Sequence, residues 1–219
     1  MSAFNFEQAR YNMIQQQIRP WEVLDPKVLD TLTAIPREDF VPERYRHLAF
    51  ADVAIPLACG QTMLKPTIEG RLLQALAVKP DDHVLVVGTG SGYITACLAH
   101  LATNVVSVDI VPELIEAARL KLKAHGIKNT ILHVGDALQG WGEHQYDVIA
   151  ITGSVATLYD VWRQSLKPGG RLFVVIGQAP VMEAQLITRL SEQEWINEEL
   201  FETYLPPLHG AEPVKSFKF

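Results

Sequence analysis

The sequence predicts an α/β protein with a doubly wound, mostly parallel β-sheet. Over residues 83–176, short apolar segments typical of buried strands alternate with longer segments of helical periodicity. The first of these strands, VLVV at residues 84–87, runs directly into the glycine-rich turn GTGSGY. In folds of this kind right-handed crossovers join the parallel strands, and ligands bind beyond the carboxyl ends of the strands. A binding site is therefore expected in the turns that follow the strands.

The N-terminal part of the chain is expected to cover that site. We predict a helical and loop region over residues 1–78 and a sheet-forming core over residues 79–219, the two making one compact unit. A helix is predicted over residues 6–18 and ended by Pro20, and a second helix over residues 26–35, where Pro26 suits a first helical turn.

The core contains the alternating pattern itself. Strands are predicted at residues 83–87, 104–108, 130–134, 147–151 and 171–176, and helices at residues 94–102, 112–125 and 155–166. After them, residues 184–190 and 198–205 are short β-like segments around SEQEW. These two segments predict a C-terminal antiparallel hairpin that closes one edge of the sheet.

Composition and charge exclude several classes of protein. A chain of 219 residues with 48% hydrophobic residues can bury one sizeable core. The formal net charge of -6 disfavours a nucleic-acid partner and an anionic membrane surface. No segment has the run of about 20 apolar residues of a membrane span, and the N-terminus does not resemble a signal peptide, so a cytoplasmic protein is predicted. Cys59 and Cys97 lack CxxC spacing and the histidines form no HxxxH pair, which predicts no metal site and packing roles for both cysteines. The oligomeric state is not predicted.

The glycine turn and the acid that follows it predict a nucleoside-containing cofactor. The turn reads G-x-G-x-G, and Tyr93 stands where the dinucleotide fingerprint has its third glycine. Asp109 ends the next strand and follows Gly88 by 21 residues, a spacing at which a carboxylate accepts hydrogen bonds from ribose hydroxyls. NAD shares this second feature, and Asp109 also suits the cap of the helix that Pro112 opens.

A third strand end completes the pattern. Asp136 is placed to accept a hydrogen bond from an adenine amino group, and Gly135 beside it allows the ring to approach; an Asx turn is the local alternative. The three strand ends thus supply contacts for the methionine part, the ribose and the adenine of S-adenosylmethionine, which has no phosphate. An NAD-dependent dehydrogenase is the weaker alternative, because no catalytic pair for hydride transfer is visible.

Several longer segments carry a resemblance to a known family. VLVVGTGSGY, DIVPEL, GDALQGW, YDVIAITGS and LKPGGRLFVVIG, with IPREDFVPERYRHLAFAD and GQTMLKP upstream, are similar in order and spacing to protein-L-isoaspartate O-methyltransferases over residues 9–207. The resemblance implies a seven-stranded methyltransferase sheet, S-adenosylmethionine as cofactor, and methylation of an isoaspartyl carboxylate in damaged proteins. The motifs and the resemblance together predict twelve cofactor-binding residues: Thr62, Met63, Val87, Gly88, Thr89, Gly90, Asp109, Ile110, Gly135, Asp136, Ala137 and Thr152.

The implied chemistry needs no general base. An aspartyl-type carboxyl, with a reference pKa of about 3.9, is ionised at neutral pH and attacks the methyl group directly. The enzyme contributes alignment and the exclusion of water. The absence of an obvious nucleophilic side chain is therefore compatible with catalysis.

One position departs from the family pattern. The family's loop carries a serine regarded as an active-site residue, and Leu64 stands there in this chain, after Thr62. Position 64 and Thr62 are the candidate catalytic positions, and TGS at residues 152–154 is a candidate source of a replacement hydroxyl. Two alternatives to a damaged protein or peptide substrate follow: a relative that methylates another acceptor, such as a small molecule, or a cofactor-binding protein without isoaspartyl activity.

Overall fold

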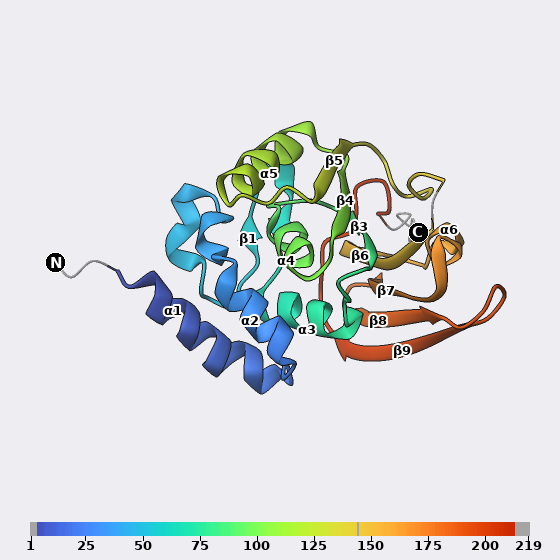
Figure 1. Cartoon of the computed structure of the whole chain (residues 1–219), viewed down its shortest axis with the longest axis horizontal. Coiled ribbons are helices and arrows are strands. Elements are labelled where there is room, and N and C mark those ends of the chain that lie inside the picture. The colour runs from blue at the N-terminus through green and yellow to red at the C-terminus, as the bar shows by residue number, and fades with distance from the viewer. Residues whose placement is uncertain (1–3, 144, 213–219) are drawn as a thin grey trace, which may run out of the picture.

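The computed structural model describes residues 4–143 and 145–212 and places a seven-stranded sheet at the centre of the molecule (Figure 1). The strand order is β5-β4-β3-β6-β7-β8-β9. Strands β5 to β7 of this order run parallel, and β7, β8 and β9 pair antiparallel. The strands are β3 (His83–Val87), β4 (Asn104–Asp109), β5 (Thr130–Val134), β6 (Tyr146–Val155), β7 (Leu166–Gln178), β8 (Val181–Arg189) and β9 (Trp195–Glu202). The predicted fold class and the C-terminal hairpin are both confirmed.

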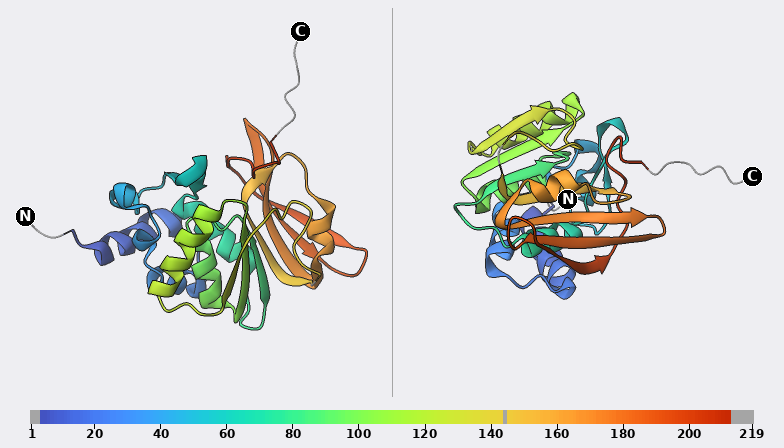
Figure 2. Two further views of the ribbon diagram at one scale, coloured as in Figure 1. Left: turned by 90° about the horizontal axis from the view of Figure 1, so that it is seen from above. Right: turned by 90° about the vertical axis from the view of Figure 1, so that its right-hand side faces the viewer.

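The helices cover the two faces of the sheet unequally. They are α1 (Phe6–Met13), α2 (Pro26–Ala34), α3 (Pro66–Leu76), α4 (Tyr93–Leu101), α5 (Pro112–Ala124) and α6 (Asp160–Gln164). Helices α1 to α5 lie on one side of the sheet, whereas α6 lies on the other side (Figure 2). Side chains of β3 alternate between the two faces of the sheet. Val84 and Val86 pack on the side of α1 to α5, and Leu85 and Val87 pack on the side of α6.

The N-terminal region shares its core with the sheet. Side chains of α1 to α5 form one buried cluster with alternate residues of β3, β4, β6 and β7. The predicted boundary near Lys79 lies between α3 and β3, and the regions on either side of it share one core. Residues 1–3 and 213–219, at the ends of the two predicted regions, lie outside the described residues.

The helix predicted over residues 6–18 continues further than expected. It runs on from α1 as a π-helical turn over Ile14–Ile18 and a 3-10 turn over Arg19–Trp21. Pro20 lies at the start of the 3-10 turn, where a missing N–H costs no intrahelical bond, so it does not end the segment.

The helix predicted over residues 155–166 is much shorter than expected, because only Asp160–Gln164 are helical. Strand β6 extends to Val155, because the backbone N–H of Ser154 donates to the Pro206 carbonyl (3.0 Å) and its carbonyl accepts from Leu208 N (2.9 Å). These bonds to the C-terminal segment keep the chain extended, which leaves only the short α6 before β7. Helix α3 was not predicted at all.

The two cysteines differ in environment. Cys97 is fully buried on α4, as predicted, and burial raises the pKa of its thiol. The prediction of a packing role is wrong for Cys59, which is exposed. Cys59 has a φ of 55° inside the 3-10 turn Ala58–Gly60, so it lies in a surface turn and not against the core.

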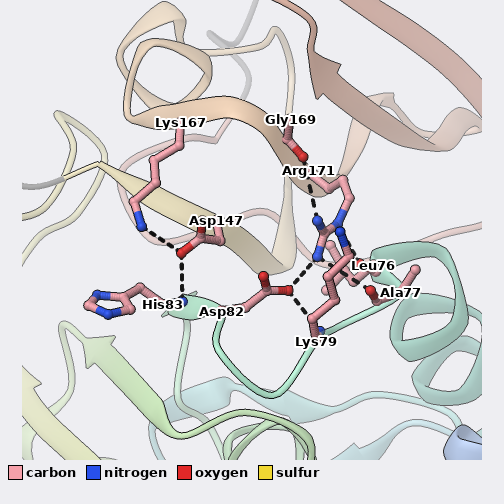
Figure 3. A network of polar contacts seen from close by, with 9 residues as sticks. All are labelled: Leu76, Ala77, Lys79, Asp82, His83, Asp147, Lys167, Gly169 and Arg171. Carbon is pink, nitrogen blue, oxygen red and sulfur yellow. Dashed lines mark hydrogen bonds and ion pairs between the residues drawn. The ribbon is translucent and has the colours of Figure 1, made fainter.

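A polar network joins the amino-terminal ends of three strands, opposite the expected site (Figure 3). Asp147 on β6 accepts hydrogen bonds from the His83 N–H (2.8 Å) and from Lys167 Nζ (2.7 Å). Next to it, Arg171 on β7 pairs with Asp82 and donates from Nε to the Leu76 carbonyl (2.7 Å). The network therefore fixes the end of α3 against β3 and β7.

In residues 4–143 and 145–212, no helix combines the length and apolar composition needed to cross a membrane.

Candidate functional site

The sheet topology creates a crevice beside β3. The crossovers from β3 to β4 and from β4 to β5 carry α4 and α5 on one face, whereas α6 precedes β7 on the other face, so the strand order reverses between β3 and β6. Ligands of doubly wound sheets bind outside the carboxyl ends of the strands at such a switch point. A pocket of about 690 Å³, open mouth included, lies there. It is lined by Gln61, Thr62, Val87, Gly88, Gly90, Val108, Asp109, Ile110, Leu114, Gly135, Asp136, Ala137, Leu138, Thr152, Gly153 and Pro206 to His209.

The glycine turn forms the floor of this pocket and packs tightly against β6. Gly88 has a φ of 91°, and a Cβ added there would lie 2.3 Å from the Thr152 hydroxyl oxygen. The Thr152 hydroxyl in turn donates to the Gly88 carbonyl (2.6 Å). A side chain at position 88 would therefore be strained and would separate the turn from β6.

Asp109 ends β4 and joins two neighbouring segments. Its side chain is 8% exposed, and its two oxygens accept from Gly90 N (2.8 Å) and Val111 N (3.0 Å). The helix-capping role foreseen as an alternative is absent, because Val111 is the N-cap of α5 and the helix has no side-chain cap among the described residues; Asp109 bonds the turn that precedes it. Each carboxylate oxygen has a second lone pair, so the same side chain can also accept the ribose hydroxyls, and that role stays a prediction.

Asp136 and Gly135 follow β5. Asp136 is exposed and forms the Asx turn that was the local alternative, with Oδ1 accepting from Leu138 N (2.9 Å). A Cβ at Gly135 would lie 2.5 Å from the Trp141 ring, so the packing of Trp141 already requires glycine there. Neither observation removes the adenine contact, because the second oxygen of Asp136 takes no part in this turn.

The loop before α3 lies over the glycine turn. Strands β1 (Ile55–Pro56) and β2 (Thr62–Met63) pair antiparallel, and Leu57 N donates to the Gln61 carbonyl (2.8 Å). Gln61 and Thr62 line the large pocket. A second, smaller pocket begins behind them and is lined by Thr62, Met63, Leu64, Glu69, Gly88, Thr89, Gly90, Ser91, Ile94 and Thr152.

Buried hydrogen bonds from Arg37 hold this loop in place. Its guanidinium is fully buried and donates to the carbonyls of Leu64 and Ala49, each at 2.6 Å, and to Glu69 Oε2 at 2.7 Å. Leu64 itself is 6% exposed and belongs to the core packed under the helices. The position of the loop is therefore set by buried hydrogen bonds and apolar packing together.

The candidate replacement hydroxyls at residues 152–154 are both bonded to the backbone. The Thr152 hydroxyl donates to the Gly88 carbonyl, and the Ser154 hydroxyl donates to the Leu205 carbonyl (2.8 Å). Each hydroxyl has one proton, which is engaged by the backbone. Neither side chain can donate to an acceptor substrate without breaking the bond that holds its own strand end.

The structure brings all the predicted site residues to these two pockets. Ten of them line the large pocket, whereas Met63, Leu64 and Thr89 line only the smaller one. Their binding and catalytic roles stay predictions.

Besides Val108, Leu114 and Leu138 of the large pocket, two groups of lining residues were missed. The first is Pro206 to His209, where the Leu208 side chain covers Gly153. The second is Glu69, Ser91 and Ile94 in the smaller pocket. Glu69 had a usable signal, because a carboxylate beside Ile68 and three residues before Leu72 lies on the apolar face of a helix.

Comparison with known proteins identifies the family. The family model described as protein-L-isoaspartate(D-aspartate) O-methyltransferase (PCMT) matches residues 8–212. The chain belongs to the PCMT family. The family predicted from the sequence motifs, and with it the methyltransferase class, is confirmed.

Curated PCMT relatives match over nearly their whole length. The protein-L-isoaspartate O-methyltransferase of Rhodopseudomonas palustris is 36% identical over 91% of this chain and 93% of its own. The protein-L-isoaspartate O-methyltransferase 2 of Pelobacter propionicus is 35% identical over 95% of this chain and 93% of its own.

Two solved structures share the PCMT fold. The Plasmodium falciparum protein assigned as a protein-L-isoaspartate O-methyltransferase, solved with S-adenosyl-L-homocysteine, aligns with a TM-score of 0.80 at 20% identity, covering 94% of this chain and 99% of its own. Another protein-L-isoaspartate O-methyltransferase aligns with a TM-score of 0.78 at 24% identity, covering 93% of this chain and 65% of its own. At these identities the likeness concerns the fold.

Proposed function

We propose that this PCMT-family protein is an S-adenosylmethionine-dependent O-methyltransferase that methylates isoaspartyl carboxylates in damaged proteins or peptides. The observation that carries the proposal is the meeting of three strand ends, those of Gly88, Asp109 and Asp136, at one pocket. The cytoplasmic location and the protein or peptide acceptor expected from the sequence belong to the same proposal.

The residues present fit this cofactor. Within the described residues, the linings of the two pockets contain no lysine or arginine, which suits a ligand without phosphate. They do contain Asp109, Asp136 and Glu69, whose carboxylates suit hydroxyl, amino and cationic groups. When bound, the cofactor supplies an electrophilic methyl group on a positively charged sulfur.

The chain's own residues bind the cofactor, orient the reacting groups and exclude water. Asp109 would accept the ribose hydroxyls, Asp136 the adenine amino group, and the turn at Gly88 would lie against the methionine part. Gln61 and Thr62 lie where they would separate the reacting groups from solvent. The acceptor carboxylate needs no base, because it is ionised at neutral pH, so alignment and water exclusion are what the protein contributes.

A methyl-transfer assay tests the proposal. The protein is incubated with cofactor labelled in its methyl group and with an isoaspartyl peptide; the same peptide with a normal aspartyl residue is the matched control. Label should enter the isoaspartyl peptide alone, as a base-labile ester. Binding of S-adenosylhomocysteine without label in either peptide would overturn the isoaspartyl acceptor, and failure to bind would overturn the cofactor as well.

A methyltransferase with another acceptor is the second candidate. The observation in its favour is that Leu64 has no hydroxyl, while the nearby hydroxyls of Thr152 and Ser154 both donate to backbone carbonyls. Label transferred to a metabolite pool and not to the isoaspartyl peptide would select this candidate.

A further inference from the structure

The smaller pocket continues the large one on the other side of the glycine turn. It has a volume of about 280 Å³, open mouth included, and shares Thr62, Gly88, Gly90 and Thr152 with the large pocket. Asp109 and Asp136 line only the large pocket. A ligand whose nucleoside end lies along these two carboxylates would therefore extend its other end past Gly88 into the smaller pocket.

Glu69 is the ionisable side chain that faces this smaller space. Of the described residues that line it, Glu69 alone carries a charge, and the side chain is 1% exposed in the first turn of α3. Its oxygens accept from Arg37 Nε at 2.7 Å and Nη2 at 3.3 Å. Two lone pairs beyond these bonds are available to a ligand.

The charges around Glu69 are not balanced by the protein. Arg37 supplies one positive charge, while Glu69 and the neighbouring Asp52 supply two negative charges. Arg37 also divides its donors, because Nη1 and Nη2 bond the carbonyls of Ala49 and Leu64. Burial raises the pKa of the Glu69 carboxyl, the Arg37 charge and hydrogen bond oppose this, and the Asp52 charge adds to the rise. A cationic ligand group beside Glu69 would offset this excess of negative charge.

The other side of the same pocket suits an anion. Ser91 Oγ accepts from Tyr93 N (3.2 Å), which leaves the hydroxyl proton of Ser91 for a ligand. Helix α4 begins at Tyr93, and the start of a helix favours a carboxylate. The smaller pocket thus offers a carboxylate from α3 and hydrogen-bond donors near α4, a pairing that matches the ammonium and carboxylate of an α-amino acid.

We propose that Glu69 accepts a hydrogen bond from the α-ammonium group at the amino-acid end of S-adenosylmethionine, and that this contact makes the site select cofactors with an intact amino group. The inference rests on the proposed function, because it needs the same cofactor in the large pocket. Glu69 is thereby a cofactor-binding residue that no sequence motif of the glycine turn reveals.

Isothermal titration with two ligands tests the inference. One ligand is S-adenosylhomocysteine, and the other is its deamino analogue, with a hydrogen in place of the α-ammonium. Glu69→Gln should weaken S-adenosylhomocysteine about 10- to 100-fold, the range for a hydrogen bond between charged groups, and should change the analogue's affinity less than about threefold. The matched control is Glu38→Gln, which removes another buried carboxylate paired with an arginine, Arg10, and lines neither pocket. It should leave both affinities unchanged.

The outcomes distinguish a failure of the Glu69 inference from a failure of the proposed function on which it rests. Equal weakening of both ligands by Glu69→Gln, or no weakening of either, would overturn the role of Glu69 and leave the cofactor assignment intact. A wild-type protein that binds neither ligand would overturn the proposed function itself. If Glu69→Gln does not fold, Glu69→Asp keeps the charge but withdraws it by one methylene, and it should show the same selective loss for S-adenosylhomocysteine.

Discussion

Replacing Asp109 by alanine should weaken cofactor binding. Asp109 combines two tasks, since its oxygens hold Gly90 N and Val111 N and its remaining lone pairs face the pocket. The substitution removes the proposed ribose contact. It also leaves two backbone N–H groups without their acceptor.

The magnitude follows from these contacts. A hydrogen bond to a charged group contributes about 1.5 to 3 kcal/mol, so the loss of the ribose contact should weaken S-adenosylhomocysteine by roughly 10- to 150-fold. Gly90 lines the open pocket, where water replaces part of the lost bonding. Asp109→Asn keeps one oxygen for one of the two N–H groups, and it should therefore lose less affinity than Asp109→Ala.

Titration calorimetry with S-adenosylhomocysteine measures the effect, and thermal unfolding without ligand separates it from damage to the fold. Asp160→Ala is the control, because Asp160 is an exposed acid at the start of α6 that lines neither pocket. It should bind as the wild type does. Unchanged affinity in a folded Asp109→Ala protein would refute the ribose assignment and the reasoning from strand ends that led to it.

The remaining predictions concern the covering loop and the base of the sheet. Leu64→Ser should raise the rate of isoaspartyl peptide methylation about tenfold, equivalent to about 1.4 kcal/mol, in a steady-state assay. The same change should lower the free energy of unfolding by roughly 2 to 4 kcal/mol, because Leu64 is 6% exposed in the core. Bound S-adenosylhomocysteine should slow hydrogen exchange at Gln61 to Met63, where the loop would cover the ligand. Asp147→Asn should lower the free energy of unfolding by about 0.5 to 1 kcal/mol at pH 7, measured by denaturant titration.

The Asp147 prediction has a definite pH dependence. Partial burial alone would raise the pKa of Asp147, but the Lys167 hydrogen bond and charge and the His83 N–H outweigh it, so the pKa lies below its ordinary value. A carboxyl with a lowered folded pKa stabilises the protein above the unfolded pKa, near 3.9, and this contribution disappears as pH falls through the folded pKa. The difference between wild type and Asp147→Asn should therefore vanish in acid. A difference that persists below that range would contradict the account.

Two results would count against the covering-loop predictions. A Leu64→Ser protein that binds S-adenosylhomocysteine normally and shows no gain in isoaspartyl methylation would favour the second candidate acceptor. Equal hydrogen exchange at Gln61 to Met63 with and without ligand would mean that the loop only connects β1 to α3.

The sequence by itself determined the elements whose signals are local. The strand and glycine turn at residues 84–93 are visible as an apolar run followed by glycines, and the acids at Asp109 and Asp136 mark the next two strand ends. Parallel strands share one edge for their carboxyl ends, so order along the chain was enough to predict that Gly88, Asp109 and Asp136 lie together. Helix α3 also has a local signal in the sequence, Pro66 followed by Ile68, Leu72 and Leu73.

Only the tertiary structure decided the features that depend on contacts between distant residues. Ser154 bonds the C-terminal segment, which turns a predicted helix start into the end of β6 and carries Pro206 to His209 to the pocket. Arg37 reaches Glu69 and Leu64 through buried hydrogen bonds across about 30 residues of sequence, and no periodicity encodes such a pairing. Local patterns show whether a position is buried. The hydrogen-bond partner of a buried polar group is fixed only once the chain has packed and has placed a donor or acceptor beside it.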